Sequence, residues 1–229
     1  YLKHSLIDMT ATKKLRFQAP DGELEVQGET IILATGGASW KKTGSDGKWA
    51  KIIQKLGIDL QDFRAMNCGF EVNWSQHFVE KVERSHLKNI ELSIFGNKSK
   101  GEAMITPYGI EGGVVYALSK FFQDTIEKEG HAIVNLDLKP DLTLDEITEK
   151  LQKRKSKDSL SNHLRKSLKL DKASIALLYE GDKDITAERI KSLSIRLDRP
   201  RPIDEAISTS GGVKFSVLNE YFESKTIPG

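Results

Sequence analysis

The sequence predicts a mixed fold in which both α-helices and β-strands contribute. Adjacent glycines at positions 36–37 and 211–212 each follow a run of small or apolar residues, as at the end of a strand. Residues 58–140 hold short alternating apolar runs, which are typical of antiparallel strands. Residues 141–193 carry repeated helix start signals. The repeated glycine theme indicates a layer that the chain enters, leaves and enters again.

Composition limits the broad class of the protein. The chain has 229 residues, enough for one large domain or two modest ones. Its 35 basic and 33 acidic side chains leave a net charge of +2, which gives no overall field toward nucleic acid or an anionic membrane. The single cysteine, Cys68, excludes an internal disulfide and indicates a reducing, cytoplasmic setting. No apolar run approaches the roughly 20 residues that cross a bilayer.

The first 57 residues are expected to form strands, a glycine turn and a helix. Residues 1–28 alternate apolar and charged side chains around the turn residues 20–22, which predicts a surface hairpin without chemistry. The unbroken apolar run 31–34 suits a strand that is covered on both faces, as in a parallel sheet. A helix then follows, capped by Ser45 or Asp46 and ending near Gly57.

The turn after residues 31–34 has two interpretations. Ligands of open α/β sheets collect outside the carboxyl ends of the strands, so the segment Thr35, Gly36 and Gly37 is a candidate ligand contact. A plain strand-exit turn explains the same residues. Neither a G-x-G-x-x-G turn nor a Walker loop occurs in the chain, so the strongest nucleotide-binding motifs are absent from it.

The middle of the chain predicts an antiparallel sheet or small barrel over about 58–140. One helix, at about 112–128, is expected to interrupt the strands, with Gly130 after its end. The loop into this helix, residues 108–113, contains three glycines. They indicate a close backbone approach, either to the neighbouring sheet or to a ligand, and the packing interpretation is the favoured one.

Residues 141–193 predict a bundle of short helices. Thr143 and Glu146 form a capping box, and Asp171 and Thr186 stand where later helices begin. The run 150–172 holds nine Lys or Arg against two Asp, which permits a phosphate-binding face. The run has no aromatic residue to stack on a base, so a solvated bundle face is favoured and nucleic acid is not expected as a partner.

Taken in order, several motifs resemble the bacterial BaiN-like NAD(P)/FAD-dependent flavoproteins. The first three are Ala-Thr-Gly-Gly-Ala-Ser-Trp, Thr-Gly-Ser-Asp-Gly, and Arg-Pro followed by Ser-Gly-Gly-Val, at 34–40, 43–47 and 201–213. A subfamily likeness adds Asn-Cys-Gly-Phe, Tyr-Gly-Ile-Glu-Gly-Gly and Leu-Ser-Asn-His-Leu-Arg-Lys, at 67–70, 108–113 and 160–166. This succession covers nearly the whole chain and is more specific than any single pair of glycines.

The resemblance implies a Rossmann-like FAD domain that is split by an inserted domain. Residues 1–57 and 202–229 would then be pieces of the FAD domain. Residues 58–201 would be the insert, made of the barrel at about 58–140 and the helical bundle at about 141–193. Members of the family begin with a G-x-G-x-x-G turn and end with a Gly-Glu-x-x-Asp strand and a closing Gly-Gly segment. The chain has neither, which implies a fragment that lacks both ends, binds FAD weakly or not at all, and is inactive alone.

The resemblance also implies particular site residues. Those carried over as contacts of the FAD are Thr35, Gly36, Gly37, Ser210, Gly211 and Gly212. Tyr108 and Glu111 are candidates to face a substrate across the flavin, although loop packing and a helix-start carboxylate explain them equally well. In a flavin enzyme the cofactor transfers the hydride or electrons, so no catalytic side chain is assigned.

The function expected from the resemblance is that of an FAD-dependent oxidoreductase, which either oxidises a small organic substrate or reduces one with NAD(P)H. Cys68 is interpreted as a small strand residue because no second cysteine can resolve an oxidised thiol. The five histidines lack a shared neighbourhood, so no metal site is predicted. The alternative is a non-enzymatic interaction module whose basic helices at 150–172 bind nucleic acid or a protein. Oligomeric state stays open.

Overall fold

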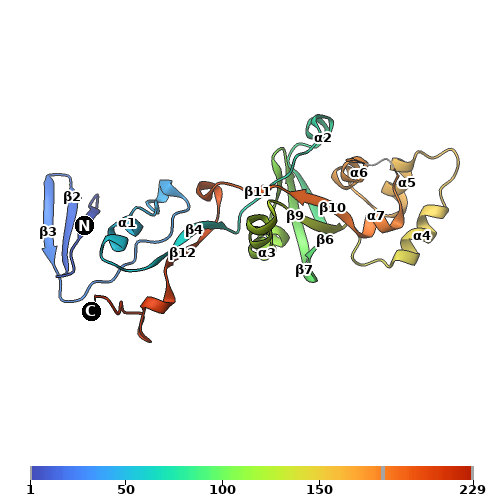
Figure 1. Cartoon of the computed structure of the whole chain (residues 1–229). Helices are drawn as coiled ribbons and strands as arrows, with labels where there is room; N and C mark the ends of the chain where they lie inside the picture. Colours follow the sequence, from blue (N-terminus) through green and yellow to red (C-terminus); the bar gives the residue numbers. More distant parts are fainter. Residues whose placement is uncertain (1, 182–183, 228–229) are drawn as a thin grey trace. The chain divides into compact units, whose positions relative to one another are not determined.

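A computed structural model describes residues 2–181 and 184–227 (Figure 1). The chain divides into two compact units. Unit 1 comprises the residues up to 65 together with those from 203 onward, and unit 2 runs from 66 to 202. The sequence had placed these divisions at 57/58 and 201/202. Within the described residues, no helix has the length and apolar character needed to cross a membrane.

Unit 1 begins with a three-stranded antiparallel sheet in the order β1-β2-β3. Its strands are β1 (Ser5–Met9), β2 (Lys14–Ala19) and β3 (Gly22–Gln27), and they confirm the predicted hairpin around residues 20–22. The other elements are η1 (Lys41–Thr43), α1 (Trp49–Lys55), β4 (Leu60–Met66), η2 (Ile203–Glu205), β12 (Ser208–Val213) and η3 (Phe215–Val217). The strand β12 pairs with β4, so segments from the two ends of the chain share one small sheet.

The core of unit 1 is small. Its buried members are Met9, Ile52, Ile53 and Ile58, and partly buried side chains such as Trp49 and Val213 pack against them. The helix α1 contributes Ile52 and Ile53, which lie one turn from Trp49 on the predicted apolar face. The cap expected at Ser45 or Asp46 is wrong: the helix begins after Lys48, and no side chain caps it.

The predicted strand at 31–34 is also wrong. These residues are extended but form no ladder with any strand of the described chain, and Ile32 is 87% exposed. A doubly covered strand needs a neighbour on each side, and the apolar run alone cannot supply one. The split Rossmann-like FAD domain is accordingly not seen among the described residues of unit 1, which instead contain one three-stranded and one two-stranded sheet.

Unit 2 is built on a seven-stranded sheet in the order β10-β9-β6-β7-β8-β5-β11. The strands are β5 (Phe70–Glu71), β6 (Ser85–Ile94), β7 (Asn97–Thr106), β8 (Gly109–Glu111), β9 (Ala132–Asp137), β10 (Leu193–Leu197) and β11 (Arg199–Pro200). The strand pairings described in this sheet are antiparallel. Only Asp198 separates β10 from β11, so the two edges of the sheet belong to one continuous segment and the barrel is nearly closed.

The barrel core is filled by the alternating inward side chains of β6, β7 and β9 and by one long helix. This helix, α3 (Gly113–Glu129), packs against β6, β7, β8 and β9 and ends at Gly130, as predicted (Figure 1). Phe122 on α3 meets Phe70 on β5 edge-to-face, with ring centroids 5.2 Å apart, and both side chains are fully buried. The predicted barrel range 58–140 omitted β10 and β11, which follow the helical bundle in sequence.

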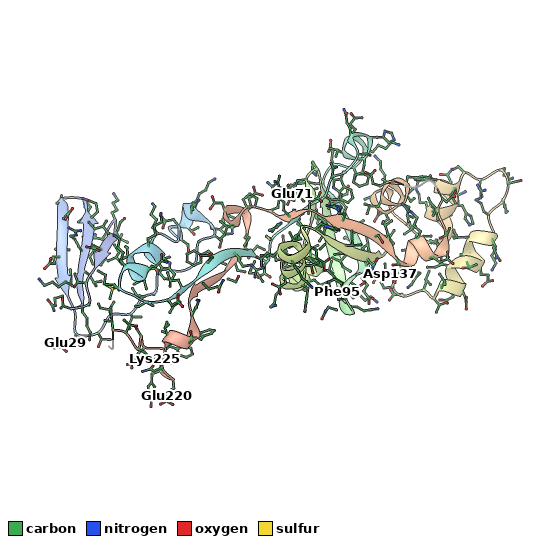
Figure 2. All side chains as sticks on the ribbon, in the orientation of Figure 1. Glu29, Glu71, Phe95, Asp137, Glu220 and Lys225 are labelled. Atoms are coloured by element: carbon green, nitrogen blue, oxygen red, sulfur yellow. The ribbon has the colours of Figure 1, made fainter. Side chains whose placement is uncertain are left out.

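The described residues of unit 2 form five further helices. The helix α2 (Gln76–Lys81) was not predicted, because its six residues show little more than one turn of periodicity. The bundle consists of α4 (Leu144–Gln152), α5 (Leu160–Ser167), α6 (Lys172–Tyr179) and α7 (Ala187–Lys191). The capping box of Thr143 and Glu146 is confirmed, as are the caps at Asp171 and Thr186. On α7, the Lys191 ammonium bonds the carbonyls of Lys139 and Leu142 and pairs with Asp137 (labelled in Figure 2) at 2.5 Å.

Candidate functional site

The two glycine pairs singled out in the sequence lie together in unit 1. The Thr209 hydroxyl oxygen accepts hydrogen bonds from the backbone amides of Ala38, at 3.1 Å, and Ser39, at 3.0 Å. An ion pair of 2.9 Å between Lys41 and Asp204 joins the same two segments. One hydroxyl group therefore fixes the loop after Gly37 against the strand that carries Gly211, across 170 residues of sequence. We call residues 35–39 and 209–212 the paired-glycine loops.

The bare glycines of these loops are used by the protein's own packing. A Cβ on Gly37 would stand 2.7 Å from the Thr209 side chain. Gly211 has a φ of +98°, and a Cβ there would stand 2.3 Å from the Asp62 carbonyl oxygen of β4. Gly211 and Gly212 lie within β12 rather than after it, which corrects the prediction of a strand that ends in glycines. A larger residue at Gly37 would have to displace Thr209, and one at Gly211 would have to displace β4 from β12.

The paired-glycine loops also present an open surface. Thr35, Gly36 and Gly211 are exposed, Ser210 is partly exposed, and Gly212 is buried against Trp49 and Phe63. The Gly36 carbonyl accepts the Trp49 indole N–H at 3.0 Å, and the Gly37 carbonyl accepts the Ser45 hydroxyl at 3.0 Å. These contacts hold the loop from one side. The backbone of Gly36 and Gly211 is exposed and carries no side chain of its own, which is compatible with the approach of a flat group such as FAD.

The two candidate substrate residues meet at one end of the barrel in unit 2. The Tyr108 hydroxyl donates to the Glu111 carboxylate, because the turn at Gly109 brings residues three apart in sequence face to face. The Arg201 guanidinium lies 4.4 Å from the centroid of the Tyr108 ring, a cation–π contact. Glu71, labelled in Figure 2, then binds two arginines, Arg201 at 2.8 Å and Arg199 at 2.6 Å.

This Tyr108 cluster includes residues that the sequence analysis did not select. Arg201 was noted only as part of the Arg-Pro motif of the resemblance, and Arg199 and Glu71 were not selected as site residues. Pairing of β5 with both β8 and β11 brings them together. The alternation of arginine with proline was the available signal, since it places both guanidinium groups on one face of an extended segment.

The Tyr108 hydroxyl is held in its neutral form. Burial raises the pKa of Tyr108 well above its usual range, and the hydrogen bond to Glu111 raises it further because a phenolate could not donate that bond. Tyr108 can therefore act as a hydrogen-bond donor or a positioning group across ordinary pH, but not as a base. Packing against the neighbouring strand explains the glycine beside Tyr108, as predicted. A Cβ on Gly109 would stand 2.0 Å from the Phe70 carbonyl oxygen of β5.

Cys68 stands next to this cluster but is inert. Its side chain is 1% exposed, and burial raises the pKa of its thiol to about 11. The thiolate, which is the reactive form, is thus scarce at neutral pH. Among the residues that the structure describes, no group of three or more His, Cys, Asp or Glu side chains could hold a metal ion.

Two lysines of the basic run at 150–172 are ion-paired within the bundle. Lys153 pairs with Glu149 at 2.5 Å and Lys166 with Asp158 at 3.7 Å. The buried His163 donates a hydrogen bond of 2.8 Å from its Nε2 to the Lys150 carbonyl and ties α5 to α4. Arg165 and Lys172 are instead directed to a cleft that is described below.

Comparison with known proteins identifies the family. No curated protein matches the chain. The family description "HI0933-like protein barrel and H2TH domain" matches residues 64–208, which is more than half of the chain and covers the barrel and the helical bundle. The family is associated with flavoproteins. Together with the antiparallel barrel that β10 and β11 nearly close, this match establishes that the chain belongs to the HI0933-like family.

Proposed function

We propose that the chain is the central part of an FAD-dependent oxidoreductase that acts on a small organic substrate, with NAD(P)H as the source of reducing equivalents. The paired-glycine loops would contact the flavin through Thr35, Gly36, Gly37, Ser210, Gly211 and Gly212. When bound, FAD supplies the hydride and electron transfer. As part of this proposal, the protein is related to the bacterial BaiN-like flavoproteins, and the chain is a fragment of such a protein.

The observation that supports this function most is the bridge at Thr209. A flavin contact shared by two glycine pairs requires that they lie side by side, and the bonds from Ala38 and Ser39 to the Thr209 hydroxyl bring them together. Their backbone is exposed at Gly36 and Gly211, where a planar ring can approach. The glycines are also needed for packing. Their position side by side, and not their lack of side chains alone, therefore supports a flavin contact.

The apolar surface of unit 1 supports a larger cofactor domain. A cleft of about 560 Å³ is lined by Met9, Ile31, Ile53, Val213 and further apolar side chains. The unpaired run at 30–33 forms part of its wall. In a Rossmann-like sheet, this run would pair with neighbouring strands, and the cleft would be covered.

The test uses the longer protein that carries this chain together with a dinucleotide-binding turn. We expect it to purify yellow with FAD bound in a one-to-one ratio, and its flavin absorption to bleach on addition of NADH or NADPH without oxygen. Thr35→Trp places a ring on the exposed face of the loops and should lower FAD occupancy about tenfold or more, since a few lost contacts cost about 1.4 kcal/mol.

Thr12→Trp is the matched control, because Thr12 is an exposed threonine of unit 1 in the turn between β1 and β2. It should leave FAD occupancy unchanged. A colourless protein that gains no flavin on refolding with FAD would contradict the proposal. Equal occupancy in the Thr35→Trp and Thr12→Trp variants would remove the paired-glycine loops from the flavin site.

A further inference from the structure

A cleft of about 590 Å³ lies between the helices α2, α5 and α6 of unit 2. We propose that this cleft binds a small organic anion with an apolar body, such as an aryl or alkyl carboxylate. The inference does not depend on the flavin proposal, because every residue that carries it lies in the bundle and in α2. The volume is within the roughly 300–1,000 Å³ typical of small-molecule sites.

The floor of the cleft is apolar and firmly held. Phe78 of α2 and Ile175 of α6 are almost fully buried, and the partly exposed Ala176 lies beside them. Trp74 stacks beneath Phe78 with ring centroids 4.7 Å apart, and its indole N–H donates to the Thr106 carbonyl at 3.1 Å. The Tyr179 ring, 41% exposed, adds an aromatic wall. Such a preformed surface suits a ring or chain of carbon atoms.

The rim of the cleft is cationic. Lys81 from α2, Arg165 from α5 and Lys172 from α6 approach it from three sides. None of the three forms an ion pair with the described residues, in contrast to Lys153 and Lys166 of the same bundle. Three positive charges around an apolar floor favour a ligand whose own charge is negative and sits at one end.

The one carboxylate beside the cleft does not oppose an anion strongly. Both oxygens of Glu180 are used by Ser75, whose amide donates at 2.6 Å and whose hydroxyl donates at 2.9 Å. These bonds secure the start of α2 against the end of α6 and so set the width of the cleft. The Glu180 charge is directed to the backbone of α2 and is offset there.

The geometry favours a small ligand over nucleic acid. Of the other cations in the run 150–172, Lys153 and Lys166 are each paired with a carboxylate, which interrupts the continuous basic track that a phosphate chain needs. The three rim cations instead enclose a single hollow, which matches one charged group. The cleft brings Phe78 and Tyr179, from outside the basic run, next to Arg165 and Lys172, and this juxtaposition was invisible in the sequence.

The test is a titration of the isotope-labelled full chain, followed by amide chemical shifts in nuclear magnetic resonance spectra. The probes are 2-naphthoate and decanoate, which separate an aryl from an alkyl body, and 2-naphthylmethanol as the uncharged match. We expect saturable shifts at residues 76–81, 160–167 and 172–179 with one or both anions. The alcohol should bind about tenfold more weakly, because it carries no negative charge for the exposed rim cations to attract.

Variants locate the binding. The double charge reversal Arg165→Glu with Lys172→Glu should weaken the anion about tenfold or more, whereas Lys166→Glu, a neighbouring exposed lysine of α5 outside the cleft, should leave it unchanged. Ala176→Trp should fill the hollow and abolish binding even where the charges are intact. A well-dispersed spectrum confirms that each variant is folded.

Three results would overturn the proposal. The first is equal affinity for 2-naphthoate and 2-naphthylmethanol in every variant. The second is a set of shifted amides that lies outside α2, α5 and α6. The third is a single-stranded oligonucleotide that displaces 2-naphthoate at lower concentration and shifts the same amides, which would assign the cleft to nucleic acid.

Discussion

At the scale of single residues, a few polar atoms determine which segments of the chain meet. The Thr209 hydroxyl accepts two backbone amides and holds the paired-glycine loops together. The Glu71 carboxylate binds two arginines, one of which lies over the Tyr108 ring. In both places a partly buried acceptor binds two donors. Leaving such a group without a partner would lower the stability of the fold by about 1–3 kcal/mol.

Cys68 gives a prediction at this scale. Because burial raises the pKa of its thiol from 9.0 to about 11, the thiolate fraction near pH 8 is about a hundredfold smaller than in an unfolded chain. We expect alkylation by iodoacetamide to be at least a hundredfold slower in the folded protein, and to accelerate as pH rises toward 11. Mass spectrometry of the alkylated fraction against time measures both rates.

The same thiol links pH to stability. The folded state holds the thiol proton more tightly, so the contribution to stability is present below pH 9 and is lost as pH rises through the window from 9 to about 11.

For the alkylation experiment, Ser156→Cys combined with Cys68→Ser supplies an exposed thiol as control. The control should react equally fast folded and unfolded. A fast-reacting Cys68 in the folded protein would mean that the site opens.

At the scale of elements, local signals set where helices begin, and strand pairing sets where strands end. Four bundle helices start at side-chain caps, provided by Thr143, Ser159, Asp171 and Thr186. Each cap satisfies an otherwise unpaired amide of the first turn. The strands β10 and β11 have no comparable local marker, since their place in the sheet is decided by β9 and β5.

The capping box of α4 gives a prediction at this scale. Thr143→Ala removes the acceptor of the Glu146 amide, a bond of 3.2 Å, and should destabilise the protein by about 1 kcal/mol in urea unfolding. Thr148→Ala is the control: it is the same substitution at a half-buried position within the same helix, where the hydroxyl bonds only the Leu144 carbonyl one turn back and alanine is the better helix former. An equal loss in both variants would contradict a capping role.

The capping effect should also depend on pH. The backbone amide of Thr143 lowers the pKa of Glu146 below 4.5, so the ionised carboxylate contributes stability above the unfolded pKa and loses it as pH falls through the folded one. The difference between wild type and Glu146→Gln, which has no carboxylate to titrate, should therefore shrink in acid. A difference that stays constant to pH 3 would show that the carboxylate has no part in the box.

At the scale of the whole molecule, the two units differ in how much apolar surface they bury. The core of unit 1 has four buried members, whereas unit 2 contains most of the fully buried side chains, including Phe70, Phe122, Leu87 and Ile105. Buried apolar area is the main source of stability. Unit 1 also leaves Ile32, Phe215 and Tyr221 exposed.

Unfolding of the chain should consequently begin in unit 1. We expect hydrogen exchange, followed by mass spectrometry at increasing urea, to expose residues 2–65 and 203–227 at lower urea than residues 66–181. Trp74 is the only tryptophan of unit 2. The change in tryptophan fluorescence that disappears in the Trp74→Phe variant therefore reports the unfolding of unit 2, which we expect to be the later transition. A single transition shared by all peptides would show instead that the units unfold as one.

Much of the fold could be predicted from local pattern. The hairpin around residues 20–22, α3 with Gly130 at its end, and the capping box at Thr143 each depend on residues within one or two turns of one another. The same holds for the contact of Tyr108 with Glu111, since a single turn brings them together. The family likeness added the order of the segments, and the match to the barrel and helical bundle confirms that likeness.

The sequence by itself determined the hairpin turn, the capped starts of α4, α6 and α7 and the paired glycines, because these depend on near neighbours along the chain. Only the tertiary structure decided that residues 31–34 form no strand, that β10 and β11 complete the barrel, and that Phe78 and Tyr179 join Arg165 and Lys172 around one cleft. The physical reason is that a strand or a cleft exists only through partners distant in sequence. A local sequence pattern does not indicate which distant segments pack against it.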